Sequence, residues 1–237
     1  MKKYRILAVT LARGGSKSIK RKNLASINGK PLIYYTIKEA LKSKLITRYI
    51  VSTDDEKTKR ISIKYGAEAP FLRPKKFSTN KAKAISADIH ALKWAEKDEK
   101  KKYDFFVELM ATNPLKTYKD IDNVLKKLIE SKADSVIGVV KLEDQHPIRI
   151  KKIVSGKISN FSKNLNEVPE THRQQLKPKA YIRNGSIYAS KRNLLLQGKR
   201  YGTKNSVPYI MDADNSVNID TKIDLMIAKE LLKKNKK

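Results

Sequence analysis

Two glycines and several cations follow the first apolar run of the chain. The run from Tyr4 to Ala12 has the character of a buried parallel strand, and a polar loop spans residues 13–23 after it. Ligands of open α/β sheets bind at the carboxyl ends of strands, which is where this loop starts. Gly14 and Gly15 would let backbone N–H groups approach an anion, and charge would come from Arg13, Lys17 and Lys22. The loop therefore predicts a phosphate site, with a solvated turn as the alternative.

The loop matches neither of two common phosphate-binding patterns. A P-loop has glycine before its lysine, whereas Ser16 stands before Lys17, and the spacing GxGxxG is absent as well. A kinase-type NTPase and a Rossmann dehydrogenase are therefore disfavoured. The sequence contains no cysteine, which excludes disulfides, cysteine zinc sites, iron–sulfur clusters and thiol nucleophiles. Its histidines are isolated from one another, so a multi-histidine metal site is also disfavoured.

The chain of 237 residues carries a large positive charge, with 53 Lys and Arg against 24 Asp and Glu. The resulting formal charge of +29 raises nucleic acid as a partner. The basic residues are spread along the chain, however, and lysine is the commoner of the two, whereas arginine makes the bidentate contacts to guanine. We therefore expect no nucleic-acid partner and a field that attracts an anionic small substrate.

The apolar segments are short. No window approaches the roughly 20 consecutive apolar residues that span a bilayer, so no membrane partner is expected. The amino terminus resembles a signal peptide only superficially, because Arg13 ends its apolar run and no small-residue cleavage site follows. The expected location is the cytoplasm.

Strand-like and helix-like segments alternate through the first 140 residues. Strands are expected at Tyr4 to Ala12, Arg48 to Thr53, Phe105 to Leu109 and Ser135 to Val140. Helices are expected at Pro31 to Ser43, Glu56 to Tyr65, Ala84 to Asp98 and Tyr118 to Ser131. These lengths fit right-handed βαβ units, and we therefore predict a three-layer α/β/α fold with a mostly parallel sheet.

The alternation breaks after Lys141. Residues 141–183 contain polar turns and two short β-like pieces, Arg149 to Val154 and Lys157 to Phe161, which indicate a small inserted lobe that protrudes from the rest. Residues 1–140 and 184–237 would form the α/β domain. Its last elements are expected to be strands at Gly185 to Ala189 and Val217 to Ile219, then a helix at Lys222 to Leu232.

Several short motifs occur in one order along nearly the whole chain. The loop itself reads Arg13-x-x-Ser16-Lys17, then Lys22-Asn23-Leu24. The later motifs are Gly29 to Leu32, Ile50 to Asp54, Leu72 to Pro74, Thr112 to Leu115, Arg173 to Tyr188 and Asn218 to Leu225. Together they resemble the acylneuraminate cytidylyltransferases, also called CMP-sialic acid synthetases. The resemblance implies a Rossmann-like nucleotidyltransferase fold and a homodimer formed through the lobe.

The resemblance also implies a reaction. CTP and a nine-carbon 2-keto sugar acid would give the CMP-sugar and pyrophosphate, with Mg²⁺ or Mn²⁺ as the cation. Such a transfer depends on positioning and charge neutralisation more than on covalent chemistry. The residues Arg173-Gln174-Gln175 favour a nonulosonic acid (sialic, legionaminic or pseudaminic) over Kdo as the acceptor. A CMP-Kdo-type enzyme or another sugar nucleotidylyltransferase remains an alternative, and a basic nucleic-acid-binding α/β protein is a distant one.

Matched positions imply a role for each site residue. Arg13 and Lys17 would hold the triphosphate, and Asp220 would complete the catalytic set. The nucleotide would also contact Gly14, Gly15, Ser16, Lys22, Asn23 and Arg73, with Asn23 reading the cytosine edge. The sugar acid would contact Arg173, Gln174, Asn184 and Tyr188. Asp220 and Asn218 would hold the metal.

This chain departs from the family pattern at several of these positions. Asn218 replaces the first aspartate of the metal pair, so the protein would contribute one formal charge fewer to the cation. Met110-Ala111 replaces Gln-Pro, Ala84 replaces a serine, and Ser18 replaces a glycine. Some roles also have structural alternatives, because Asp220 could cap the last helix and Tyr188 could belong to the core.

Overall fold

The computed structural model describes residues 4–16, 18–165 and 172–234. Within these residues the largest sheet has six strands in the order β10-β6-β9-β5-β1-β4. Their bounds are β1 Ile6–Leu11, β4 Arg48–Ser52, β5 Phe105–Leu109, β6 Ser135–Lys141, β9 Tyr181–Lys191 and β10 Ser206–Ile210. Among these six strands, β9 alone runs antiparallel to its neighbours, β5 and β6. The prediction of a mostly parallel sheet is confirmed.

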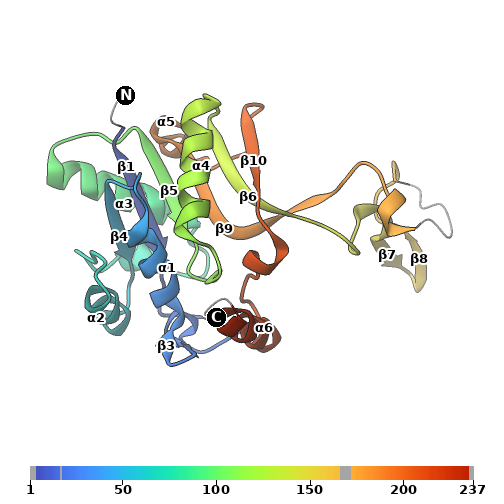
Figure 1. Cartoon of the computed structure of the whole chain (residues 1–237), viewed down its shortest axis with the longest axis horizontal. Helices are drawn as coiled ribbons and strands as arrows, with labels where there is room; N and C mark the ends of the chain where they lie inside the picture. Colours follow the sequence, from blue (N-terminus) through green and yellow to red (C-terminus); the bar gives the residue numbers. More distant parts are fainter. Residues whose placement is uncertain (1–3, 17, 166–171, 235–237) are drawn as a thin grey trace.

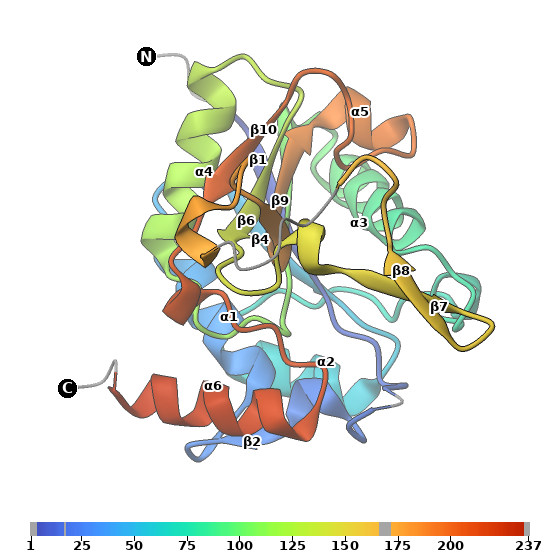
Figure 2. The same ribbon diagram turned by 90° about the vertical axis from the view of Figure 1, so that its right-hand side faces the viewer.

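Helices cover both faces of this sheet, as expected. Their bounds are α1 Leu32–Lys42, α2 Glu56–Lys64, α3 Ala84–Glu99, α4 Tyr118–Glu130, α5 Arg192–Leu196 and α6 Lys222–Lys234. Figure 2 shows α1 and α4 on one side of the sheet and α3 and α5 on the other. Successive side chains of β1 alternate between the two layers: Ile6 and Ala8 pack on the α1–α4 side, Leu7 and Val9 on the α3 side. Burial on both faces explains the continuous apolar run of this strand.

Side chains at the starts of two helices fix where these helices begin. Asp55 caps α2 by accepting a hydrogen bond of 2.8 Å from the backbone N–H of Thr58. Thr117 and Asp120 form a reciprocal capping box at the start of α4. Because both helices begin just after the carboxyl ends of strands, these caps also define the loops beside the candidate site.

The last helix returns to the start of the chain. α6 packs its Ala228 and Leu232 into a small core with Ile27 and Leu32, which belong to the hairpin β2 (Ser26–Ile27) and β3 (Lys30–Pro31) and to α1. This packing brings the residues just before α6 next to the loop that follows β1. Lys22 and Asp220, which are 198 positions apart in the sequence, therefore meet at one place.

The segment after β6 forms a projection from the body of the molecule (Figure 1). β6 and β9 remain paired as far as Lys141 and Tyr181, and the chain between them carries the hairpin β7 (Lys151–Val154) and β8 (Lys157–Asn160). We call residues 142–180 the lobe. Among the described residues, no helix combines the length and apolar character needed to cross a membrane.

In the last third of the chain, one predicted strand is absent and two observed elements were not predicted. Val217 to Ile219 is no strand: it is extended chain, tied to the body by the hydrogen bond from the Ile219 N–H to the Thr112 carbonyl. Its apolar residues are explained by packing against α6 and the hairpin. β10 and α5 were not expected at all. Pro208 inside β10 argues against a strand, and it is tolerated because β10 lies at the sheet edge.

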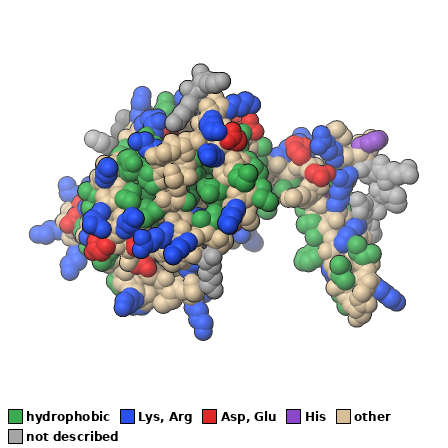
Figure 3. Space-filling model, turned by 90° about the horizontal axis from the view of Figure 1, so that it is seen from below, with side chains coloured by type: hydrophobic (Ala, Val, Ile, Leu, Met, Phe, Trp, Pro, Cys, Tyr) green, Lys and Arg blue, Asp and Glu red, His purple; other side chains and the backbone are tan. Residues whose placement is uncertain are grey.

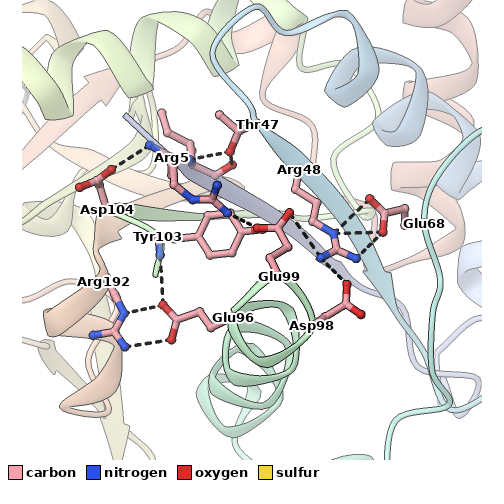
Figure 4. Close-up of polar contacts among 11 residues, drawn as sticks. Arg5, Thr47, Arg48, Glu68, Glu96, Asp98, Glu99, Tyr103, Asp104 and Arg192 are labelled. Carbon is pink, nitrogen blue, oxygen red and sulfur yellow. Dashed lines mark hydrogen bonds and ion pairs between the residues drawn. The ribbon is translucent and has the colours of Figure 1, made fainter. Parts of the chain in front are cut away.

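A polar cluster occupies the amino-terminal end of the sheet (Figure 4). Arg48, at the start of β4, pairs with Glu68 at 2.7 Å and with Asp98 at 2.9 Å. Arg192 donates two hydrogen bonds to Glu96 near the end of α3. These pairs hold α3 against β4 and α5 against α3 at this end, and the opposite, carboxyl end is where ligands of such sheets bind.

Candidate functional site

A cavity of about 460 Å³ lies at the carboxyl ends of β1 and β5. Five segments wall it: the loop after β1, the short 3-10 helix at Lys22–Leu24, residues 73–87, the end of β5 with Thr112, and Asp220 just before α6. The predicted residues that line it are Arg13, Ser16, Lys22, Asn23, Arg73 and Asp220. The structure thus brings together side chains from both ends of the chain.

The loop after β1 is held by side chains that approach its backbone. The N–H of Gly14 donates to the Asp54 carboxylate at 2.9 Å, and the Asn23 amide donates to the Arg13 carbonyl at 3.1 Å. A Cβ on Gly14 would lie 2.8 Å from the Cβ of Asp55, so this position has no room for a side chain. Gly15 has open space instead. Lys17 lies outside the described residues.

Lys22 connects this loop to the segment before α6. Its ammonium donates to the Ile219 carbonyl at 2.7 Å and to the Asp220 carboxylate at 2.9 Å. The Lys22 side chain is 12% exposed, while that of Asp220 is 65% exposed and faces the cavity. An ammonium and a carboxylate therefore lie in contact at the cavity wall.

Arg73 is the most buried cation of the cavity, at 4% exposure. Its guanidinium donates to the Ser78 hydroxyl at 3.0 Å and to the Ser52 carbonyl at 3.3 Å, and lies 3.8 Å from Asp54. Burial lowers the pKa of Arg73, while the charge of Asp54 opposes that change. The sequence analysis included Asp54 in a family motif but gave it no role as an anchor of the loop and of Arg73.

The sequence predicted Asp220 and Asn218 as the donors for a metal ion, and the structure places the two side chains in contact. The Asn218 amide nitrogen donates to Asp220 at 2.6 Å, and its amide oxygen is buried without a hydrogen-bond partner among the described residues. The backbone N–H of Thr221 donates to Asp224 and the Asp224 N–H to the Thr221 hydroxyl, so these two residues cap α6 and Asp220 is not needed for that task. Carboxylate and amide oxygens suit Mg²⁺.

Few acidic groups gather around these two residues. In the described part of the chain, no three His, Cys, Asp or Glu residues lie close enough together to hold a metal ion. The residues present therefore fit a divalent cation only if other oxygen atoms complete its coordination, as the phosphates of a bound nucleotide can.

The residues expected to contact the sugar acid do not line this cavity. Arg173 and Gln174 lie on the lobe and are exposed. Asn184 is buried, and its amide donates to the Ser216 hydroxyl at 3.0 Å. Tyr188 stacks on Tyr201 with 5.6 Å between the ring centroids. The predicted nucleotide half of the site is thus assembled in one place and the predicted sugar half is not.

Sequence reasoning missed an ionic cluster beside the cavity. Glu108 on β5 is 1% exposed and lines the cavity, Asp88 on α3 is fully buried, and Arg200 pairs with both carboxylates. Burial raises the pKa of Glu108, and burial together with the charge of Glu108 raises that of Asp88. A glutamate within the apolar run Phe105–Leu109 was the signal that could have identified this cluster.

Comparison with known proteins identifies relatives along the whole chain. A sequence profile described as Cytidylyltransferase matches residues 7–236. The chain is 34% identical over 234 residues to the Post-translational flagellin modification protein B of Campylobacter coli. This match covers 96% of this chain and 95% of that protein. It is 31% identical over 229 residues to a Pseudaminic acid cytidylyltransferase of Campylobacter jejuni, with 97% of each chain covered.

A solved structure supports the fold. The CMP:2-keto-3-deoxy-manno-octonic acid synthetase in complex with CTP is 17% identical to this chain, with a TM-score of 0.70, and the match covers 98% of this chain and 99% of the other. At this identity the likeness concerns the fold alone, and it agrees with the three-layer architecture described above.

Proposed function

The chain belongs to the cytidylyltransferase family, and on that basis we propose that it transfers CMP from CTP to the anomeric hydroxyl of a nonulosonic acid. The observation that carries the proposal is the convergence of Arg13, Lys22 and Arg73 on one cavity at the carboxyl ends of parallel strands. The positive charge of these three side chains is opposite to that of a triphosphate. The acceptor class is supported by the relative named as a pseudaminic acid enzyme.

In the proposed reaction the anomeric hydroxyl oxygen attacks the α-phosphorus of CTP in line with the leaving group. A bond forms between these two atoms, and the bond from the α-phosphorus to the oxygen that bridges to the β-phosphate breaks. Pyrophosphate leaves with that oxygen and its electron pair, and the hydroxyl proton passes to solvent. The residues of the cavity contribute positioning and charge neutralisation, which is what such a transfer needs.

Each residue of the loop would act on a defined part of CTP. Arg13 and Lys17 would hold the triphosphate, with the backbone of Gly14, Gly15 and Ser16 beside it. Lys22 would face the phosphates and orient Asp220 through their contact of 2.9 Å. Asn23 donates its amide N–H to the loop, so it would present its amide oxygen to the cytosine amino group.

Asp220 and Asn218 would hold a divalent cation, Mg²⁺ or Mn²⁺, together with phosphate oxygens. When bound, the cation would neutralise charge on the phosphates. Asp220 already contacts the ammonium of Lys22, so the protein offers the cation little net negative charge before CTP arrives. We therefore propose that the metal binds weakly to the free protein and more strongly in the presence of CTP.

We further propose a homodimer in which a second copy covers the lobe. Apolar side chains are exposed on it, with Ile153 at 76%, Ile158 at 71% and Phe161 at 64%. Figure 3 shows hydrophobic side chains on the lobe, where it stands apart from the body. Exposed apolar groups gathered on a small projection are typical of an interface. Residues 141–183 would thus serve dimerisation, and Arg173 and Gln174 would reach a sugar acid only through the partner copy.

Pyrophosphate release from CTP tests the proposed function. The assay uses the full chain with Mg²⁺ and compares sialic, legionaminic and pseudaminic acids with Kdo. Release with a nonulosonic acid, and none with Kdo, is the expected result. Release with Kdo alone would assign the chain to the Kdo-type alternative, and absence of release with all four acids would contradict the proposal. Light scattering on the same sample tests the dimer, which a monomer at all concentrations would contradict.

A further inference from the structure

A second cavity, of about 450 Å³, adjoins the first. The start of α3 and the segment after α5 form its walls, and its lining consists of Lys83, Ala84, Ile85, Gly198, Lys199, Arg200 and Tyr201. Ala84 lines both cavities, so they are neighbours. The second lining contains three cations and no carboxylate. A group that extends from the first cavity into the second would therefore meet hydrogen-bond donors and positive charge.

An ion pair lies between the two cavities. Glu108 lines the first cavity, Arg200 lines the second, and the guanidinium of Arg200 pairs with the Glu108 carboxylate. The same guanidinium nitrogen lies 3.8 Å from Asp88, and the guanidinium carbon lies 5.4 Å from the centroid of the Tyr188 ring. Tyr188 is the register partner of Glu108 across β5 and β9. Three rigid elements thus fix the position of Arg200.

Arg200 retains hydrogen-bonding capacity that a comparable arginine of this chain has used. Arg192 also pairs with a glutamate of the α3–α5 layer, Glu96, but gives Nε to one carboxylate oxygen and Nη2 to the other (Figure 4). Arg200 donates to Glu108 through Nη1 alone, among the residues that the structure describes. Its Nε and Nη2 donate no hydrogen bond to another described residue, and 22% of its side chain is exposed, so this capacity remains for a ligand in the second cavity.

Burying Glu108, Asp88 and Arg200 together costs folding free energy, which argues against a purely structural role for this cluster. Two carboxylates are buried beside one guanidinium, and both oxygens of Asp88 lack a hydrogen-bond partner among the described residues. Replacing a buried ion pair by apolar residues of similar volume is often neutral or stabilising. Groups that break the rules of packing in this way tend to mark functional sites.

We propose that Arg200, held by Glu108 and Asp88, is a specificity-determining residue that donates hydrogen bonds to oxygen atoms of the acceptor sugar acid. The inference rests on the proposed function, because the acceptor must reach the α-phosphate in the first cavity. A nine-carbon acid is long enough to extend from there into the second. Its polar substituents, rather than the nucleotide, would meet the guanidinium fork.

Kinetics of two matched double variants test the proposal. Glu108→Leu with Arg200→Met removes the pair and leaves only Asp88 without its arginine partner, whereas the single Arg200→Met would leave both Asp88 and Glu108 so. Glu96→Leu with Arg192→Met removes the corresponding pair that lines neither cavity. For each protein, the thermal midpoint, the KM for CTP and kcat/KM for each acid of the panel are measured on the full chain.

The first double variant should lose about tenfold to a hundredfold in kcat/KM for the preferred acid, the range expected for a hydrogen bond to a charged group. Its KM for CTP should change less, and its order of preference among the acids should change too. The control should keep the wild-type order. If both double variants had the same kinetics at comparable thermal midpoints, the role proposed for Arg200 would be overturned, but the proposed function would not. A wild-type protein that uses no sugar acid would overturn this inference and the proposed function together.

Discussion

Replacing Asn218 by aspartate turns a hydrogen bond into a contact between two carboxylates. The Asn218 amide now donates to Asp220 at 2.6 Å, so the variant would place two negative charges about 3 Å apart. At that distance two unit charges repel by roughly 1.4–2.8 kcal/mol for effective dielectric constants of about 40–80. The larger dielectric constant, and with it the smaller repulsion, applies because the Asp220 side chain is 65% exposed and Lys22 lies 2.9 Å away.

The expected effect on stability follows from this repulsion and the lost hydrogen bond. Together they should lower the unfolding free energy of metal-free Asn218→Asp by about 2 kcal/mol. For a chain of this size that corresponds to a fall of about 4–8 °C in the thermal midpoint. A divalent cation between the two carboxylates removes the repulsion, so Mg²⁺ should restore the midpoint of the variant and raise that of the wild type less.

Thermal unfolding in chelator and in a series of Mg²⁺ concentrations measures both effects, and the Mg²⁺ dependence of pyrophosphate release measures the catalytic one. The variant should need less Mg²⁺ for half-maximal rate. Asn215→Asp is the matched control, because it adds the same charge three residues away on the 3-10 helix Ala213–Asn215, outside the cavity lining. If Asn218→Asp were as stable as the wild type in chelator and needed as much Mg²⁺, the metal site would lie elsewhere. Full activity of Asp220→Ala would show the same.

Three further predictions concern the loop and a buried lysine. Arg13→Ala should lower kcat/KM by about 30- to 1,000-fold through loss of a charged phosphate contact, measured by pyrophosphate release. Gly14→Ala should raise the KM for CTP at least about tenfold because its Cβ would meet Asp55, whereas Gly15→Ala, with open space, should not. Burial lowers the pKa of Lys116 to about 7, so between pH 7 and about pH 10 the native state holds fewer protons than the unfolded one. The unfolding free energy should therefore rise with pH over this range, by up to about 1.4 kcal/mol per pH unit relative to Lys116→Met, as urea denaturation would show.

Periodicity predicted those parts of the fold that depend on local patterns. Phe105–Leu109 was expected as a strand with the bounds it has, since both of its faces are covered and its run is almost wholly apolar. α1 to α4 begin and end within about one residue of the expected positions, because caps and apolar stripes are local signals. The prediction of a strand at Val217 to Ile219 failed for the opposite reason. Its apolar side chains serve contacts with α6 and the hairpin, and no local pattern distinguishes those contacts from a strand.

The candidate site shows the same division between local and long-range information. Arg13, Ser16, Lys22 and Asn23 lie within one loop, so a short motif could predict that they meet. Asp220 could be placed with them only through the family resemblance, because the packing of α6 against the hairpin brings it there. The Glu108–Arg200 pair joins residues 92 positions apart, and it depends on α5 and the turn after it, which sequence reasoning left without an assigned structure.

Acceptor recognition is therefore the part of the activity that a single sequence specifies least visibly. A triphosphate has one shape and charge, and loops of glycines and cations recur in the sites that bind it. Sugar acids differ in a few substituents, and a protein distinguishes them by hydrogen bonds at the far side of the site. The acceptor side proposed here is built by α3, β9 and the segment after α5, where Arg200 is fixed by two acids and an aromatic ring from separate elements. With the role proposed for Arg200, selection among acceptors can change through Arg200 and Glu108 while the loop proposed to bind CTP stays the same.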